Sequence, residues 1–408
     1  MKPYFTTFFL LFLFVFPFSA YAQDSIRFDE SGLESVMQRA KVEKKPIFYM
    51  AYADWCPHCK NIKATTLKDP EVVSFMNANY VFAGLNFEKP GSEDFKTKYN
   101  VKTFPTFLVL DENGQELARF TGELKKDKFL SEVKLALNPK QQLPYLKAEY
   151  EKDKTNGLNL MRYLVALKKG KDRNELNPIA HEYFEKLTDD KIVNEVNWKI
   201  FTNGVSDIAS REYQFVITNQ QAFAAITSQK RVNDKFKNSV MELLKPIVKT
   251  NDVANYKKQR AIAKTINSPM IDSLLFQYDL DHYEFNSNWN EYKKVAAADI
   301  KKYVWNSPKE IKSIVLNVMR NSTDAASLNQ SLSWIKHSNE LEESYDGIVL
   351  EARVHRKLNN IPIAITITKK AKAFSTQMGW DGKEADKLLA DLLERKKIAA
   401  KPAAKTKK

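Results

Sequence analysis

The chain has 408 residues, too many for one ordinary hydrophobic core, so its length predicts two or three domains. Lysine and arginine outnumber aspartate and glutamate by 64 to 50, but much of the net charge of +14 lies in residues 395–408, an Ala/Lys/Pro tail that we expect to be disordered. This distribution argues against a nucleic-acid partner and leaves open a solubilising role or weak attraction to anionic envelope surfaces.

The first segment in chain order is an export signal, predicted over residues 1–22. An apolar run over residues 5–18 follows Lys2 and precedes Ala20-Tyr21-Ala22, the layout of a cleavable secretory signal. Its apolar centre is short for a bilayer span, so we expect no stable membrane insertion after cleavage. An uncleaved N-terminal anchor is the alternative. We expect a mature protein that begins near Gln23 and is periplasmic or secreted.

Residues 23–138 alternate helical and strand patterns, as a small α/β domain requires. Apolar residues at helical spacing predict a first helix from Leu33, and the apolar run 47–53 predicts a buried strand. That strand leads into Trp55-Cys56-Pro57-His58-Cys59-Lys60 and a polar helix to about Leu67. The remaining predicted elements are a helix from Pro70 to about Ala78 capped by Asp69, a strand over 81–86, a helix over 92–99, a strand over 107–110, a turn over 111–114, a strand over 116–121 and a closing helix over 127–137.

Residues 139–144 contain two prolines and are the predicted linker. From 145 to 394 the glycines are few and apolar residues recur every three or four positions, which predicts helices throughout. The piece around Asn359-Asn360 resembles a tetratricopeptide-type helical hairpin, with small residues at Ala352, Ala364 and Ala371. We therefore expect an irregular α-helical array that resembles tetratricopeptide repeats. Its tryptophans are expected in the core and not on a binding surface: Trp198, Trp289, Trp305, Trp334 and Trp380.

The cysteine pair carries the predicted chemistry. A Cys-x-x-Cys pair that opens a helix places its first sulfur beside unpaired backbone N–H groups and the positive end of the helix dipole, which stabilises the thiolate. Because the thiolate is the form that attacks disulfides, Cys56 is the predicted attacking residue and Cys59, one turn further, the resolving one.

Two other roles for the pair are open. A zinc half-site would need further ligands, but no other cysteine exists and the remaining histidines are scattered through the helical region without a motif: His181, His282, His337 and His355. A purely structural disulfide would close a very short loop and stabilise little. No metal and no cofactor are therefore expected.

These motifs resemble the thioredoxin superfamily, most closely the C-terminal periplasmic domain of the transmembrane disulfide reductases. The resemblance covers about residues 25–138 and is carried by Tyr52-Ala53-Asp54-Trp55-Cys56-x-x-Cys59-Lys60, Asp69-Pro70-x-Val72 and Phe104-Pro105-Thr106. It implies an α/β thioredoxin fold, a redox couple of Cys56 and Cys59, and Pro105 as a cis-proline beside the sulfurs. The predicted substrate contacts are Trp55, Pro57, Phe104 and Pro105; an ordinary trans turn at Pro105 is the alternative.

The sequence departs from that family at two positions. The buried acid that typically lies six residues before the first cysteine is replaced by Met50, and a lysine common on the neighbouring strand is matched by Gly84. The proton relay is thus missing or rerouted. His58 is the nearest titratable replacement and our third catalytic candidate, with tuning of Cys56 as its other possible role.

The residues around the pair point in both redox directions. The Pro57-His58 dipeptide resembles that of the periplasmic oxidant DsbA, and a partly charged imidazole near Cys56 favours the thiolate and makes the disulfide more oxidising. The preceding Tyr-Ala-Asp-Trp context resembles reductases. We predict a reduction potential above that of cytosolic thioredoxin and leave the direction open.

Two hypotheses for the whole chain remain. The first is an exported thiol-disulfide oxidoreductase that acts on protein cysteines, is recharged by a redox partner protein, and uses its helical domain to contact client or partner. The second is an envelope protein-binding scaffold in which the helical domain carries the function and the thioredoxin fold is accessory.

Overall fold

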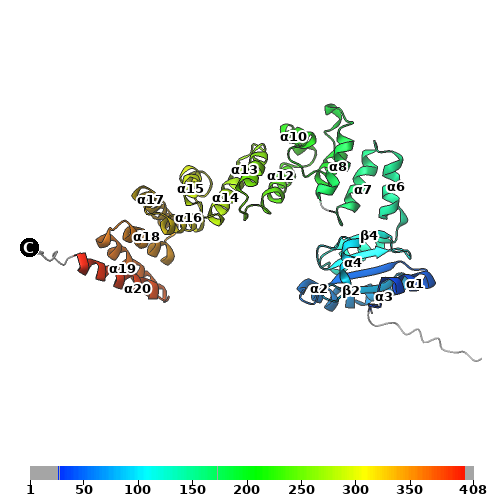
Figure 1. Ribbon diagram of the computed structural model, residues 1–408, viewed down its shortest axis with the longest axis horizontal. Coiled ribbons are helices and arrows are strands. Elements are labelled where there is room, and N and C mark those ends of the chain that lie inside the picture. The colour runs from blue at the N-terminus through cyan, green and yellow to red at the C-terminus, as the bar shows by residue number, and fades with distance from the viewer. Residues whose placement is uncertain (1–25, 27, 172, 400–408) are drawn as a thin grey trace, which may run out of the picture. The chain divides into compact units, whose positions relative to one another are not determined.

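The computed structural model describes residue 26 and residues 28–171 and 173–399 (Figure 1). The predicted signal over 1–22 and the last part of the predicted tail, 400–408, lie outside these described residues. The chain divides into two compact units, Met1–Tyr213 and Gln214–Lys408. None of the helices in the described ranges has the length and apolar character needed to span a bilayer.

The first unit is built on a four-stranded sheet with the order β2-β1-β3-β4. Strand β1 (Ile47–Tyr52) pairs in parallel with β2 (Val81–Asn86) and antiparallel with β3 (Thr106–Leu110), and β3 pairs antiparallel with β4 (Glu116–Thr121). Every residue of β1 is buried. This explains why its sequence is a continuous apolar run, since a central strand covered on both faces needs no polar side.

Helices cover both faces of this sheet. Side chains alternate along β1, so Phe48 and Met50 belong to one core cluster, while Tyr49 and Ala51 belong to the other. The first cluster includes residues of α2 (Pro57–Ala64), α3 (Pro70–Asn79) and α5 (Lys126–Ala136), and the second includes residues of α1 (Leu33–Glu43) and α4 (Ser92–Lys98). The predicted α/β layout is confirmed over the described elements from α1 to α5.

The helix after the cysteines is shorter than predicted. It ends at Ala64 and is followed by a 3-10 turn, Thr66–Lys68, where the sequence predicted one helix to about Leu67. The Thr65 hydroxyl donates a hydrogen bond to the Asn61 carbonyl (2.8 Å), a local bond of the kind that competes with continuation of a helix. The predicted cap of α3 is confirmed, because the Asp69 carboxylate accepts a hydrogen bond from the Glu71 amide (3.0 Å).

Among the described residues after Ala136 the regular secondary structure is entirely helical, as predicted. Their bounds are α6 Leu143–Lys152, α7 Gly157–Leu167, α8 Arg173–Phe184, α9 Glu195–Gly204, α10 Arg211–Thr218, α11 Gln220–Ile226, α12 Gln229–Leu244, α13 Val253–Lys264, α14 Pro269–Phe285, α15 Trp289–Tyr303, α16 Pro308–Asn321, α17 Ala325–Leu341, α18 Tyr345–Lys357, α19 Ile361–Met378 and α20 Lys383–Ala399, with short 3-10 helices at Pro139–Gln141 and Asp189–Lys191. The predicted linker 139–144 thus contains a 3-10 helix and the start of α6. Its role as a domain boundary stays a prediction.

The edge strand β4 packs against α6, the first α-helix of this region (Figure 1). Arg119 of β4 is buried, pairs with Glu116 (2.6 Å), and donates hydrogen bonds to the carbonyls of Tyr99 and Asn100. Gly170, after α7, lies against its guanidinium, where an added Cβ would stand 2.7 Å from Nε. Gly170 therefore leaves the space that Arg119 occupies.

In the hairpin of α18 and α19, the small residues that the sequence singled out lie in the core. Ala352, Ala364 and Ala371 are fully buried, and the chain turns at Asn359 with a positive φ of 61°. The likeness to tetratricopeptide repeats stays a prediction. The core assignment of Trp380 is wrong: its side chain is 53% exposed and touches Phe374 near the start of the turn to α20.

Helix α20 continues to Ala399, so residues 395–399 of the predicted tail are helical. The Arg395 guanidinium pairs with Asp391 one turn earlier (3.0 Å), and Leu392 is fully buried. The compositional argument for disorder overlooked these anchors within the last turns.

Candidate active site

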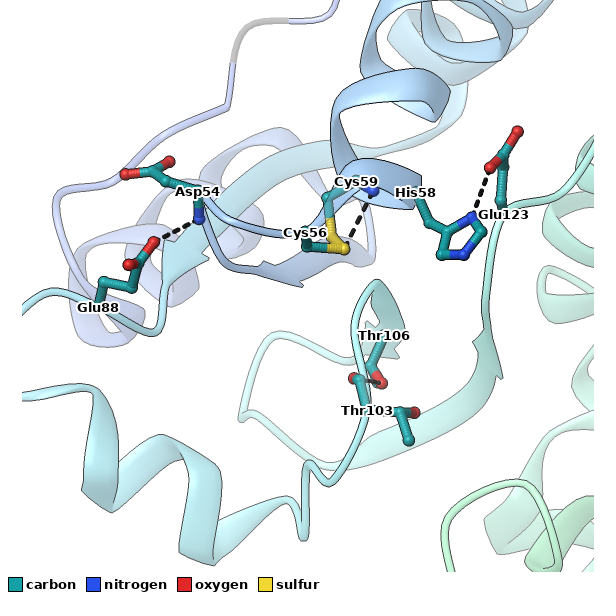
Figure 2. The surroundings of a disulfide bond; sticks show 8 residues. All are labelled: Asp54, Cys56, His58, Cys59, Glu88, Thr103, Thr106 and Glu123. Carbon is teal, nitrogen blue, oxygen red and sulfur yellow. Dashed lines mark hydrogen bonds and ion pairs between the residues drawn. A yellow bond between two sulfur atoms is a disulfide. The ribbon is translucent and has the colours of Figure 1, made fainter. Parts of the chain in front are cut away.

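Cys56 lies at the N-cap of α2, where the chain turns out of the buried strand β1 (Figure 2). Pro57 occupies the first turn, where its missing N–H leaves no bond unmade. The Cys56 sulfur accepts a hydrogen bond from the Cys59 amide (3.1 Å). The sulfur therefore takes the place of a capping oxygen at the positive end of the helix, the position that stabilises a thiolate.

The two cysteines are joined by a disulfide, with their Cα atoms 5.3 Å apart. Both residues are nearly buried, Cys56 at 3% and Cys59 at 1% exposed. The geometry brings together the two residues that the sequence predicted as a couple.

An aromatic surface adjoins the pair. Trp55 is 66% exposed, and its ring packs edge-on against Phe104 (5.9 Å between centroids), which in turn contacts Phe87 (5.1 Å). Phe104 also packs against the core cluster that contains both cysteines. Trp55 and Phe104 are thus in contact, whereas Pro57 and His58 lie on the helix that the pair opens.

The turn that carries Phe104 and Pro105 belongs to the surroundings of the disulfide (Figure 2). The peptide bond between these two residues is cis, the geometry that the resemblance implied. The Thr106 hydroxyl donates to the Thr103 carbonyl (2.7 Å), and the Pro105 carbonyl accepts a hydrogen bond from the Gly122 amide (2.9 Å). The turn is therefore stabilised by one hydrogen bond within it and by another from the segment that follows β4.

His58 is bound on the side away from Cys56 by a carboxylate (Figure 2). Its Nδ1 lies 2.8 Å from Oε2 of Glu123, and the other Glu123 oxygen accepts a hydrogen bond from the Asn61 amide. The two hydrogen bonds, led by that from His58, hold the pKa of Glu123 below its ordinary value. His58 itself is 66% exposed.

The segment before Cys56 is held by residues at the end of β2 and just after it. The Glu88 carboxylate accepts a hydrogen bond from the Asp54 amide, and the Asn86 side chain donates to the Asp54 carboxylate (2.8 Å). The turn that presents Trp55 and Cys56 is thus fixed by side chains from a neighbouring strand end.

The two departures from the thioredoxin pattern are packed apolar positions. Met50 is fully buried, and an added Cβ at Gly84 would stand 3.1 Å from the Cβ of Phe28. The half-buried Lys63 of α2 has its ammonium 3.1 Å from the centre of the Tyr52 ring, and burial lowers the pKa of Lys63. The acid and lysine of the family are thus replaced by packing.

The other histidines do not converge. His181 pairs with Glu212 (3.1 Å), His282 is buried and bonds to the Val248 carbonyl (2.9 Å), and His337 stacks on Trp305. Within the described ranges, no group of three or more His, Cys, Asp or Glu side chains is arranged to hold a metal ion.

The sheet order, the covering helices and the cysteine pair define a thioredoxin-like domain. A family model described as a thioredoxin-like domain matches residues 33–137. This part of the chain is therefore a thioredoxin-like domain with a Cys-x-x-Cys pair, and a long helical region follows it.

Its relatives are disulfide exchange proteins. The thiol:disulfide interchange protein DsbD of Campylobacter jejuni is 28% identical over 104 residues, and that of Haemophilus ducreyi is 31% identical over 111. These matches cover 25% and 24% of this chain but only 18% and 19% of the relatives' own length. The solved C-terminal domain of Neisseria meningitidis DsbD, in its oxidised form, is 25% identical with a TM-score of 0.23, and the match covers 24% of this chain and 88% of that one. Residues 33–137 thus form a thioredoxin-like domain, and this part of the chain resembles a segment of DsbD.

Sequence reasoning missed Glu123, Asn61 and Glu88. Asn61 follows His58 by three residues and so shares its helix face, which was a readable signal. Glu123 could have been found from Gly122, which directly follows β4, the strand that pairs with β3 just after the Phe104-Pro105 turn. Glu88 had no such signal, because its carboxylate accepts a hydrogen bond from the backbone amide of Asp54, and a backbone amide is present whatever the residue type.

Proposed function

We propose that the chain is an exported thiol-disulfide oxidoreductase that acts on protein cysteines. The proposal rests on the position of the Cys56 sulfur at the N-cap of α2. This sulfur forms a disulfide with Cys59 and accepts a hydrogen bond from the Cys59 amide. Similarity to disulfide interchange proteins supports it, since these relatives carry the matching domain. Export is supported by the N-terminal sequence, and the periplasm is the compartment in which such chemistry is common.

In the reducing direction, the Cys56 thiolate attacks one sulfur of a client disulfide. A Cys56–client bond forms, and the other client sulfur leaves as a thiolate that takes a proton. Cys59 then loses its proton and attacks the Cys56 sulfur, which releases the second client thiol and forms the Cys56–Cys59 disulfide. Two electrons pass from the pair to the client; in the oxidising direction every step runs in reverse.

The aromatic surface of Trp55 and Phe104 is the proposed contact for the client chain, with Pro57 and Pro105 beside it. Exposed aromatic rings bind strongly when water is excluded around them, and Trp55 is the exposed ring of this surface. His58 is the proposed tuning group on α2. The helical region is proposed to contact the client or the redox partner protein.

A trapping experiment tests the proposal. In Cys59→Ser the resolving sulfur is absent, so mixed disulfides with client proteins should accumulate on Cys56 and be released by dithiothreitol. The matched control is the Cys56→Ser/Cys59→Ser double variant, which should trap none. Capture that is equal in both variants and resists reduction would instead favour the scaffold hypothesis, in which the helical region binds envelope proteins.

A further inference from the structure

The contact between Glu123 and the helix that carries the cysteines is not explained by the exchange steps themselves. Glu123 lies 65 residues from His58 in the chain, yet one of its oxygens is 2.8 Å from Nδ1 of that ring. Its other oxygen accepts a hydrogen bond from Asn61, one turn further along α2. A single exposed ion pair is weakly held, but a carboxylate that uses both oxygens on one helix face has a fixed position.

The charge of His58 matters because of where it lies. A cation two residues after Cys56, in the first turn of α2, stabilises the thiolate and therefore the reduced form of the pair, which makes the disulfide a stronger oxidant. A carboxylate bonded to the same ring cancels that charge. The imidazolium and Glu123 together present no net charge to the sulfur, whereas the imidazolium alone presents one positive charge.

We propose that Glu123 is a positioning residue that holds His58 and masks its charge, so that the Cys56–Cys59 couple is less oxidising than its Pro-His dipeptide alone would make it. The proposal rests on the redox function proposed above and concerns the same site. Glu123 acts through His58 and does not touch the sulfurs. Asn61 fixes the free oxygen of Glu123 and so keeps the carboxylate on the ring.

The test is the equilibrium of the full chain with reduced and oxidised glutathione at pH 6.0. Glu123→Gln keeps the size of the side chain and an oxygen for Asn61 but removes the charge. We expect the equilibrium of the variant to shift three- to tenfold toward the reduced pair, a rise of about 15 to 30 mV in reduction potential for a two-electron couple.

Two further variants assign the effect. Glu112→Gln removes the same charge from the turn between β3 and β4 and should leave the equilibrium unchanged. In a His58→Ala background, Glu123→Gln should shift the equilibrium by less, because the ring through which Glu123 acts is gone and only the direct field of the carboxylate at the sulfur remains.

An unchanged equilibrium in Glu123→Gln would overturn the inference, as would a shift of equal size in the His58→Ala background. Either result would leave the proposed function standing. If the parent pair did not exchange with glutathione at all and trapped no client, the proposed redox function itself would fail.

Discussion

Replacing Arg119 by Met should destabilise the edge strand β4, which leads into the segment that carries Glu123. Arg119 is 6% exposed, and its guanidinium is bonded to the Glu116 carboxylate and to two backbone carbonyls, those of Tyr99 and Asn100. Removing one partner of a buried ion pair costs about 3 to 5 kcal/mol, and each lost hydrogen bond about 1 kcal/mol. Glu116 keeps 22% of its side chain in solvent and can be hydrated, so we expect a net loss of about 2 to 3 kcal/mol.

Hydrogen exchange of the full chain is the measurement. A loss of about 2 to 3 kcal/mol corresponds to about 30- to 150-fold faster exchange of the amides of β4 that open with this edge. Lys128→Met is the matched control, since Lys128 is 61% exposed and its pair with Glu132 on the same helix should contribute about 0.5 kcal/mol or less.

Gly170→Ala attacks the same contact from the other side and should also speed exchange in β4, because its Cβ would stand 2.7 Å from the Arg119 Nε. Exchange in β4 that is the same in Arg119→Met and in Lys128→Met would refute the reasoning.

Three further variants test other parts of the molecule. Trp55→Ala removes a side chain that is 66% exposed, so thermal stability should hardly change, while the rate with protein disulfides should fall about fivefold or more relative to the rate with glutathione disulfide; equal losses with both substrates would contradict a client contact. Asp69→Ala removes the cap of α3 and should lower the Tm of the first unit by about 2 to 4 °C, and an unchanged Tm would count against the cap. Burial lowers the pKa of His355 below its ordinary value of 6.5, so the unfolded chain binds more protons and the second unit should lose stability as the pH falls through 6.5; melting curves at pH 7.5 and 5.0 should show that loss in the parent and a smaller one in His355→Leu, and equal losses would rule His355 out as the cause.

The sequence predicted the secondary structure of the thioredoxin-like domain well because each element carried a local signal. The buried run of β1 and the Asp69-Pro70 cap depend on neighbours within a few residues. Helix ends were less accurate: a hydroxyl bond at Thr65 ends α2 early, and the ion pair of Arg395 extends α20 into the predicted tail.

The helical region shows what local patterns omit. Apolar spacing predicted that the chain is helical there, but not that Trp380 would lie exposed beside a turn. A tryptophan is placed by the tertiary contacts available to it, and these come from segments far apart in the sequence. The same limit applies to the division into two compact units at Tyr213, which the composition did not predict.

The candidate site divides along the same line. Cys56, Cys59 and the Phe104-Pro105 turn were found because short motifs specify them. The loss of the family's buried acid was also readable at Met50, but the packing that accompanies the loss, with Phe28 against Gly84, was not. A ring that fills the place of an absent side chain leaves no motif, since many apolar residues would serve.

The redox direction is the property that a motif describes least well. The dipeptide between the cysteines specifies which groups are available at the start of α2, and here it supplies an imidazole two residues after Cys56. The effect of that imidazole depends on its own neighbours, and in this fold the segment after β4 brings a carboxylate to it from 65 residues away. A chain with the same Cys-Pro-His-Cys motif and a neutral residue at the position of Glu123 would expose the full imidazolium charge to the sulfur. The reduction potentials of such proteins should therefore be compared by the dipeptide between the cysteines only when the residue at the position of Glu123 is compared as well.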